Sequence, residues 1–324
     1  AHLKLDLSET NGAQILQEVE LKADDIAGII GGPPCQGFSS MGSNNRSDPR
    51  DRLFQRFFEI VDEISPKFFV CENVPGLLRP DFEDIREEAL NIVAPNYNII
   101  GPLKLVASDY GAPTTRTRVF FIGTLKSSEA TFTQEDFDPT ETITTTVGDA
   151  LSGLPRKICD SWQKEQQGWR KVQRSKPSSP FAKHLEGNIP VGVGDEESLE
   201  RLIAKSQVSG CLGTVHLPKV VDRFSKVAEG SFDSISRAPR LNRKGFCPTL
   251  RAGTGAERGS YQAVRPIHPT QNRVITPREA ARLQGFPDWF RFDSTKWHSF
   301  RQIGNSVSPL LSAYILERIF KSIV

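Results

Sequence analysis

A cysteine held between prolines and glycines is the side chain in this sequence best suited to chemistry. Residues 31–40 read Gly-Gly-Pro-Pro-Cys-Gln-Gly-Phe-Ser-Ser and directly follow an apolar run, residues 26–30. An apolar run that ends in Gly-Gly predicts a buried strand opening into a loop, and α/β sheets place active sites at such strand ends. A cysteine chosen at random is more often a buried structural residue. The stiff neighbours leave this thiol little core to pack into, so we interpret Cys35 as a nucleophile.

Two further apolar runs end or begin in charged residues. Glu72 follows the run 67–71, and Arg118 opens the run 118–123, with Arg116 two positions earlier. Strand, helix and strand in this order predict parallel pairing in an α/β layered domain, in which the strand ends share one edge. Each charged residue alone fits a solvated surface position. Together with the cysteine they predict one site that holds a thiol, a carboxyl group and two guanidinium groups.

The elements around these residues also leave clear signals. Helical spacing of Leu53, Phe57, Val61 and Ile64 predicts a helix between the first two strands. Between about 150 and 265 periodic segments are few and glycines many, which predicts a second, irregular domain. Two helices close the chain: one has a capping box at Thr276-Pro277-Arg278-Glu279 and ends at Gly285, and one runs from Ser308-Pro309 to about Lys321.

Composition narrows the class of protein. A formal charge of +2 over 324 residues neither demands nor excludes a polyanionic partner. Basic residues and tryptophans alternate over 156–176, which suits either a solvated face or a phosphate backbone. The five scattered cysteines form no CxxC pair, so we expect a reducing compartment and no metal site. The sequence has no signal peptide and no apolar run of membrane length, so we expect a cytoplasmic protein without a membrane partner.

Several ordered motifs resemble those of DNA (cytosine-5)-methyltransferases. They bracket nearly the whole chain in the order of that family, with a variable region in the expected gap. The motifs are Pro33-Pro34-Cys35-Gln36, Glu72-Asn73-Val74, Asp109-Tyr110-Gly111-Ala112-Pro113 followed by Arg116-Thr117-Arg118, Pro277-Arg278-Glu279-Ala280-Ala281-Arg282-Leu283-Gln284-Gly285-Phe286-Pro287, and Gln302-Ile303-Gly304-Asn305-Ser306-Val307.

This resemblance implies an α/β fold: a Rossmann-like, S-adenosylmethionine-dependent methyltransferase domain with a smaller, irregular target-recognition domain. The corresponding boundaries are residues 1–150 for the catalytic domain, 151–287 for target recognition and 288–324 for a C-terminal segment that returns to the catalytic domain. It also implies a modification enzyme of a restriction–modification or related defence system, acting on duplex DNA at the prokaryotic nucleoid.

The resemblance further implies a mechanism. Cys35 would add to carbon 6 of a flipped-out cytosine and thereby activate carbon 5 to attack the methyl group of S-adenosylmethionine. Glu72, when protonated, would hydrogen-bond ring nitrogen 3. Arg118 would hold the carbonyl oxygen of the base, and Arg116 would stabilise negative charge and lower the thiol pKa.

Binding roles follow in the same way. For the cofactor, the resemblance assigns Asp6 to the adenine, Pro34 to a position beside the cofactor, and Asn305 and Val307 to the completion of the pocket. Asn305 also fits a turn-stabilising role before the last helix. For DNA, a loop from Ser39 to Arg52 would close over the flipped nucleotide, and a Thr-Leu signature at residues 249–250 would open the recognition loop. The residues assigned to DNA are Gln36, Ser39, Thr249, Arg251, Arg258 and Gln262.

Two departures from the family pattern matter. Pro113-Thr114 stands where the family has Pro-Gln, and the Phe-x-Gly-x-Gly cofactor loop has no counterpart before Asp6. We therefore expect a second chain or an N-terminal segment to supply that loop. Two alternative functions remain open at this point: a partial or non-catalytic DNA-binding subunit that needs a partner, and an RNA cytosine methyltransferase.

Overall fold

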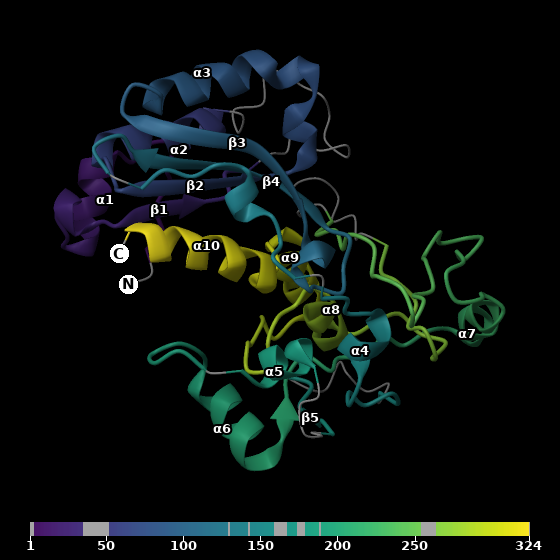
Figure 1. The fold of residues 1–324 in the computed structure, drawn as a ribbon. Helices are drawn as coiled ribbons and strands as arrows, with labels where there is room; N and C mark the ends of the chain where they lie inside the picture. The colour runs from purple at the N-terminus through teal and green to yellow at the C-terminus, as the bar shows by residue number, and fades with distance from the viewer. Residues whose placement is uncertain are drawn as a thin grey trace. The chain divides into compact units, whose positions relative to one another are not determined.

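The chain divides into two compact units (Figure 1). Unit 1 comprises residues 1–105, 117–138 and 315–324, and unit 2 comprises residues 106–116 and 139–314. The structure is a computed structural model, and it describes residues 3–34, 52–128, 130–141, 143–158, 167–173, 179–187, 189–253 and 264–323.

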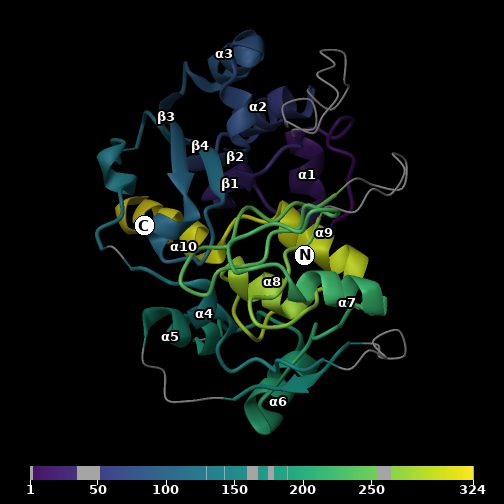
Figure 2. The same ribbon diagram turned by 90° about the vertical axis from the view of Figure 1, so that its right-hand side faces the viewer.

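A four-stranded sheet is the centre of unit 1. β1 (Gly28–Gly31) pairs in parallel with β2 (Phe68–Asn73), and β2 pairs in antiparallel fashion with β4 (Thr117–Leu125). β3 (Tyr97–Val106) lies outside β4, so the order is β1, β2, β4, β3, as Figure 2 shows. The predicted α/β class is confirmed, but parallel pairing of the strand at Arg118 was wrong. β4 begins at the edge where β2 ends, because Asn73 lies opposite Val119.

The sequence analysis did not predict β3. Its interior contains Gly101-Pro102, a dipeptide that is typical of a turn. Proline lacks the N–H that a central strand must donate, but an edge strand tolerates it. β3 is an edge strand of the described sheet, which explains how the dipeptide fits. This additional strand carries the chain across the sheet before β4, and it therefore reverses the expected direction of β4.

Helices cover both faces of the sheet. Consecutive residues of β2 point to opposite faces, so each face presents side chains of β2 to a helix. On one face the ring of Phe69 packs against Phe58 of α2 (Arg52–Ile64), with ring centroids 5.6 Å apart. On the other face Phe68 contacts Phe320 of α10 (Pro309–Ile323), with centroids 6.0 Å apart. The helices predicted at these positions are confirmed. α1 (Gly12–Val19) and α3 (Glu83–Val93) complete the helices of unit 1 among the described residues.

Unit 2 consists largely of irregular segments around short helices. Its helices are α4 (Val147–Leu151), α5 (Pro180–Glu186), α6 (Glu196–Lys205), α7 (Pro218–Ser225), α8 (Pro277–Leu283) and α9 (Lys296–Asn305), and its two-residue strands are β5 (Arg170–Lys171) and β6 (Gln207–Val208). The predicted capping box of α8 is confirmed, since the Thr276 side chain accepts from the Glu279 N–H and the Glu279 carboxylate accepts from the Thr276 N–H. Gly285 follows α8 with φ +88°, a conformation that favours glycine.

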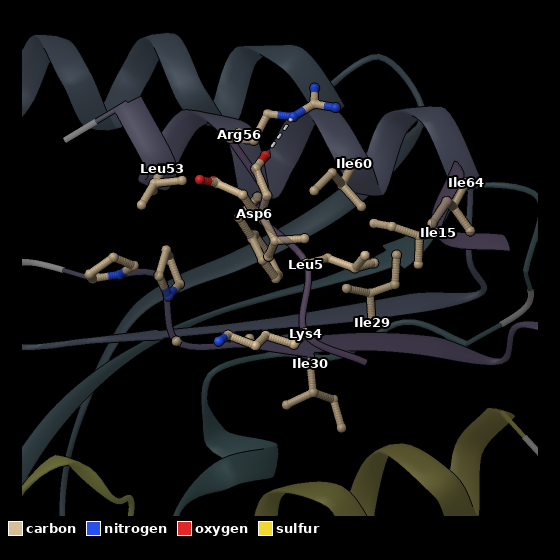
Figure 3. Close-up of a pocket in the computed structure, with 16 residues that line it drawn as sticks. Lys4, Leu5, Asp6, Ile15, Ile29, Ile30, Leu53, Arg56, Ile60 and Ile64 are labelled. Carbon is tan, nitrogen blue, oxygen red and sulfur yellow. Dashed lines mark hydrogen bonds between the residues drawn. The ribbon is translucent and has the colours of Figure 1, made fainter. Parts of the chain in front are cut away.

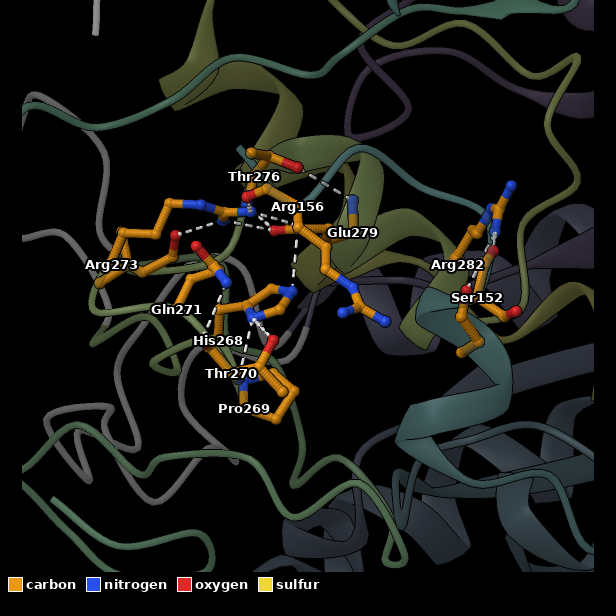
Figure 4. Close-up of polar contacts among 12 residues, drawn as sticks. Ser152, Arg156, His268, Pro269, Thr270, Gln271, Arg273, Thr276, Glu279 and Arg282 are labelled. Carbon is orange, nitrogen blue, oxygen red and sulfur yellow. Dashed lines mark hydrogen bonds and ion pairs between the residues drawn. The ribbon is translucent and has the colours of Figure 1, made fainter. Parts of the chain in front are cut away.

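Buried polar side chains hold this irregular backbone together (Figure 4). The Glu279 carboxylate receives two hydrogen bonds from Arg273, at 2.6 and 2.8 Å, and lies 3.6 Å from His268. Arg282 donates to the carbonyl oxygens of Ala150 and Ser152 and pairs with Asp288. The functional boundaries at residues 150 and 287 stay a prediction, because the two units follow contacts rather than function. Among the described residues, no helix is long and apolar enough to cross a membrane.

Candidate active site

Glu72 and Arg118 meet at one edge of the sheet in unit 1. Glu72 lies near the end of β2 and Arg118 near the start of β4, and antiparallel pairing brings these positions to the same edge. The Arg118 Nε and Glu72 Oε1 atoms are 2.5 Å apart, and both side chains are largely buried. Arg118 also donates to the carbonyl oxygen of Thr117 at 2.8 Å. The sequence predicted that these two residues converge, and the structure brings them together.

The loop that leads to Cys35 lies against this ion pair. β1 and β2 pair as far as Gly31 opposite Cys71, so Gly32 comes next to Glu72. A Cβ atom on Gly32 would lie only 2.9 Å from Glu72 Oε2, so glycine is what allows the carboxylate this close to the backbone. Asn73 donates to the carbonyl oxygen of Pro33 at 3.4 Å and fixes the same loop from β2. From the sequence, Gly32 was expected only to end the first strand, and Asn73, which belongs to the motif Glu72-Asn73-Val74, was given no role.

The described cysteines are unsuited to act as nucleophiles. Cys71, Cys211 and Cys247 are free and buried. Burial raises the pKa of Cys71, with a further contribution from the charge of Glu72, and burial raises the pKa of Cys211 to about 12. Burial also raises the pKa of Cys247. Since the thiolate is the reactive form, none of these three cysteines suits the nucleophilic role that the sequence predicts for Cys35.

Some predicted site residues lie outside the described part of the chain. They are Cys35, Gln36 and Ser39 in the first predicted loop and Arg258 and Gln262 in the predicted recognition loop. Their assignments stay predictions. The described backbone ends at Pro34, one residue before Cys35, so the structure does place the start of the predicted catalytic loop beside Glu72.

A pocket of about 810 Å³ lies beside the same loop in unit 1 (Figure 3). Asp6 and Pro34, both predicted to contact the cofactor, line it together. Apolar side chains form much of the remaining wall, including Ile15, Ile29 and Leu53. The Asp6 carboxylate accepts hydrogen bonds from the Ser8 hydroxyl and N–H, which lower its pKa. The pocket therefore offers an anionic acceptor at its rim and an apolar surface for a flat ring.

Arg56 fixes the segment that carries Asp6, and the sequence analysis missed it. From α2 it donates to the carbonyl oxygens of Leu7 and Thr10, at 3.3 and 3.0 Å. It also pairs with Glu63, whose carboxylate accepts from the Gly12 N–H at 2.5 Å. The charged residues on one face of the otherwise apolar helix α2 were the signal in the sequence that could have indicated this role of Arg56. These contacts hold one wall of the pocket against α2.

Arg116 occupies a different environment from Arg118. Its side chain is 1% exposed, and it donates to the carbonyl oxygens of Leu250 and Gly304 at 2.9 and 2.7 Å. Both acceptors belong to unit 2, as Arg116 itself does. These two hydrogen bonds go to backbone oxygens, whereas the family resemblance assigns Arg116 to the stabilisation of charge at the reacting base.

The remaining predicted residues lie next to these two carbonyl acceptors in unit 2. Thr249 and Arg251 are exposed on either side of the buried Leu250. Asn305 is exposed at the end of α9, directly after Gly304, and Val307 follows it partly exposed. Neither pair lines the pocket described in unit 1. Within the described residues, no group of three or more His, Cys, Asp or Glu side chains is arranged to hold a metal ion.

Comparison with known proteins decides the family. The sequence matches the profile of C-5 cytosine-specific DNA methylases over residues 4–321. The chain belongs to the C-5 cytosine-specific DNA methylase family. The predicted resemblance and the predicted enzyme class, a DNA (cytosine-5)-methyltransferase, are therefore confirmed.

Individual relatives agree with this assignment. The type II methyltransferase M.XorII of Xanthomonas oryzae is 36% identical over 97% of this chain and 73% of its own length. M.DdeI of Desulfomicrobium norvegicum is 32% identical over 93% of this chain and 74% of its own length. A solved prophage-encoded structure from E. coli, assigned as a DNA modification methyltransferase, matches with a TM-score of 0.88 and 46% identity, covering 99% of this chain and 86% of that one. These relatives do not favour the alternatives of a non-catalytic subunit or an RNA methyltransferase. Methyltransferases of this kind generally use S-adenosylmethionine.

Proposed function

We propose that the chain transfers a methyl group from S-adenosylmethionine to carbon 5 of a flipped-out cytosine in a specific duplex DNA sequence. The Glu72–Arg118 ion pair beside the loop that enters Cys35 carries this proposal. The Cys35 thiolate bonds to carbon 6, and carbon 5 takes the methyl group as its bond to the sulfonium sulfur breaks and S-adenosylhomocysteine is left. A base then removes the carbon 5 proton, and the thiolate leaves. The target carbon is inaccessible inside a duplex, so the base must first leave the stack.

Glu72 and Arg118 neutralise each other in the structure, so the base must separate them to use both. We propose that the guanidinium of Arg118 then donates to the carbonyl oxygen of the cytosine in place of Glu72. Glu72 then binds a proton and donates it as a hydrogen bond to ring nitrogen 3. Gly32 matters here because it lets the carboxylate stand next to the catalytic loop. Arg116 acts through the backbone instead, since its guanidinium lies on carbonyl oxygens.

The pocket in unit 1 fits the proposed cofactor in size and chemistry. Its volume of about 810 Å³ lies in the range of small-molecule sites. Asp6 would accept hydrogen bonds from the amino group of the adenine, and the apolar wall with Pro34 would cover the ring faces. Asn305 and Val307 would also contact the cofactor, as the family pattern assigns them. When bound, S-adenosylmethionine supplies an electrophilic methyl group.

Residues of unit 2 supply most of the proposed DNA contacts. The exposed Thr249 and Arg251, with Arg258 and Gln262, would contact bases or phosphates, and Gln36 and Ser39 would contact the flipped nucleotide. Type II relatives support a role as the modification enzyme of a restriction–modification system. Such an enzyme works on the DNA of its own cell, so we propose that it acts in the cytoplasm at the nucleoid.

The open edge of β1 supports an additional strand. β1 is an edge strand of the described sheet, and its Ile30 is 57% exposed. An apolar edge of this kind invites pairing with another segment. We propose that a partner chain or an additional N-terminal segment pairs here and brings the glycine-rich cofactor loop. Addition of a protein that contains this segment should tighten cofactor binding, and unchanged binding would refute the added strand.

The proposal is tested by transfer of labelled methyl groups to mixed-sequence duplex DNA. Cys35→Ala should abolish transfer, and Glu72→Gln should lower kcat by about 10²–10⁴-fold. Cys247→Ala is the matched control, because it removes a buried cysteine that has no role in the proposed chemistry. Full activity of the Cys35→Ala variant would refute the proposal.

A further inference from the structure

Residues 113–116 run alongside the start of the predicted recognition loop in unit 2. The Cys247 N–H donates to the carbonyl oxygen of Pro113 at 2.9 Å, and the Thr115 N–H donates to that of Cys247 at 3.0 Å. The Thr114 hydroxyl, which is fully buried, donates to the same Cys247 oxygen at 3.0 Å. Thr114 stands where the family has glutamine, and here its short side chain reaches the backbone directly.

Arg116 extends this connection to a third segment. One of its terminal nitrogens donates to the carbonyl oxygen of Leu250 and the other to that of Gly304. Gly304 also packs directly on the recognition segment, because a Cβ atom there would lie 2.4 Å from the Ala252 nitrogen. The guanidinium plane thus joins the backbone between Thr249 and Arg251 to the backbone directly before Asn305.

From this geometry we propose that Arg116 is a positioning residue that couples duplex recognition to cofactor binding. The inference rests on the proposed function, which assigns Thr249 and Arg251 to DNA and Asn305 and Val307 to the cofactor. A duplex that shifts the Leu250 carbonyl moves an acceptor of Arg116, and Arg116 transmits that shift to the Gly304 carbonyl. Both carbonyl oxygens are bound by nitrogens of one rigid guanidinium plane, so a movement of one carbonyl group displaces the other.

Lysine at position 116 separates this role from a purely electrostatic one. Arg116→Lys keeps the positive charge but has a single nitrogen, which cannot hold two carbonyl oxygens in the same fork. A direct role in charge stabilisation predicts that kcat falls while the coupling between ligands persists. The coupling role predicts the reverse: the ligands bind independently, and the KM for each ligand rises by a larger factor than kcat falls.

The test measures binding of S-adenosylhomocysteine, which cannot react, with and without a mixed-sequence duplex. We expect the duplex to tighten binding by about 5–150-fold in the unmodified chain. In the Arg116→Lys variant this factor should fall close to one. The matched control is Arg278→Lys, since Arg278 is an equally buried arginine of unit 2 that donates to the carbonyl oxygens of Ser209, Pro287 and Phe290. Its variant should lose stability but keep the coupling.

Each outcome decides the inference. Coupling that survives in Arg116→Lys overturns it, as does coupling that is lost equally in Arg278→Lys or absent from the unmodified chain. If Arg116→Lys does not fold, Thr114→Val replaces it, because this variant loses one hydroxyl contact in the same connection and should lower the coupling about threefold. Failure of methyl transfer even after addition of the protein that supplies the cofactor loop refutes the proposed function instead, and the binding measurement still reports on coupling.

Discussion

The two units bury their backbones by different means. In unit 1 the carbonyl groups of β2 are satisfied by the neighbouring strands, and the core around Phe58, Phe69 and Phe121 is almost entirely apolar. In unit 2 irregular segments leave carbonyl groups without such partners, and buried arginines donate to them. Arg240 donates to the carbonyl oxygens of Phe224, His268, Pro269 and Gln271, and Arg278 binds four oxygen atoms.

This difference has a physical reason. A buried carbonyl group without a donor is costly, so an irregular fold must bring donors from side chains. Arginine supplies five donors on one rigid plane and keeps its charge under burial. Irregular backbone of this kind suits a region that presents loops to DNA, while a regular sheet suits a region that fixes catalytic groups in place.

The largest expected effect comes from removing one of these arginines. Arg278→Met leaves several buried oxygen atoms without donors and should destabilise the protein by about 3 kcal/mol. Hydrogen exchange should show faster opening of α8 in unit 2, while β2 in unit 1 keeps its protection. The urea midpoint measures the total loss. Equal loss of protection in both units would contradict the proposed difference between the two cores.

Acid should weaken unit 2 through His268. Burial lowers the pKa of His268 to about 4, with the charges of Arg273 and Arg240 acting in the same direction and that of Glu279 opposing them. The unfolded chain binds this proton below pH 6.5 while the folded chain does not, so stability falls as pH drops from 6.5 towards 4. Between pH 7 and 5 the loss should be about 2 kcal/mol.

Urea unfolding at the two pH values measures this loss. A His268→Gln variant is the control, and its stability should change much less over the same range. If both proteins respond to acid equally, His268 does not carry the effect.

A core substitution in unit 1 should cost less than the loss of Arg278. Phe69→Leu removes ring contacts with Phe58 and Tyr97, whose centroids lie 5.6 and 5.3 Å away, but leaves every hydrogen bond of β2 intact. We expect a loss of about 1–2 kcal/mol, measured by urea unfolding. A cost above that of Arg278→Met would reverse the ranking of the two cores.

The smallest effect concerns an exposed pair on α10. Lys321 Nζ lies 2.6 Å from Glu317 Oε1 one helical turn earlier, and both side chains are mostly exposed. Lys321→Ala should change stability by less than any of the substitutions above, and by still less at 1 M salt, because solvent and ions screen an exposed pair. Thermal unfolding at low and high salt checks this. A change comparable to that of Phe69→Leu would mean that this surface pair stabilises unit 1 as much as the core ring contacts do.

The secondary structure of unit 1 was easier to predict from the sequence than that of unit 2. The reason is the same difference in how the two cores are built. Strands and helices that bury one face repeat their apolar residues, and the runs before Gly31 and Glu72 therefore stood out. β3 escaped because Gly101-Pro102 interrupts its pattern. Arginine–carbonyl contacts have no period, since their acceptors are backbone atoms far away in the sequence, as Leu250 and Gly304 are for Arg116.

The candidate site divides in the same way. Glu72 and Arg118 could be predicted because each ends or begins a recognisable strand. The contacts of Gly32 and Arg56 depend on how elements pack and could not be inferred from spacing alone. The role of Arg116 needed the irregular backbone of unit 2 to be known.

The central claim is that Cys35 forms a bond to cytosine during transfer. A duplex in which fluorine replaces the carbon 5 hydrogen tests it directly, because methyl transfer can occur but the carbon 5 proton needed for release is missing. Incubation with S-adenosylmethionine should leave a covalent protein–DNA product, and peptide mass spectrometry should place the bond at Cys35. Absence of that product while ordinary duplex DNA is methylated, or a bond at another residue, would contradict the account.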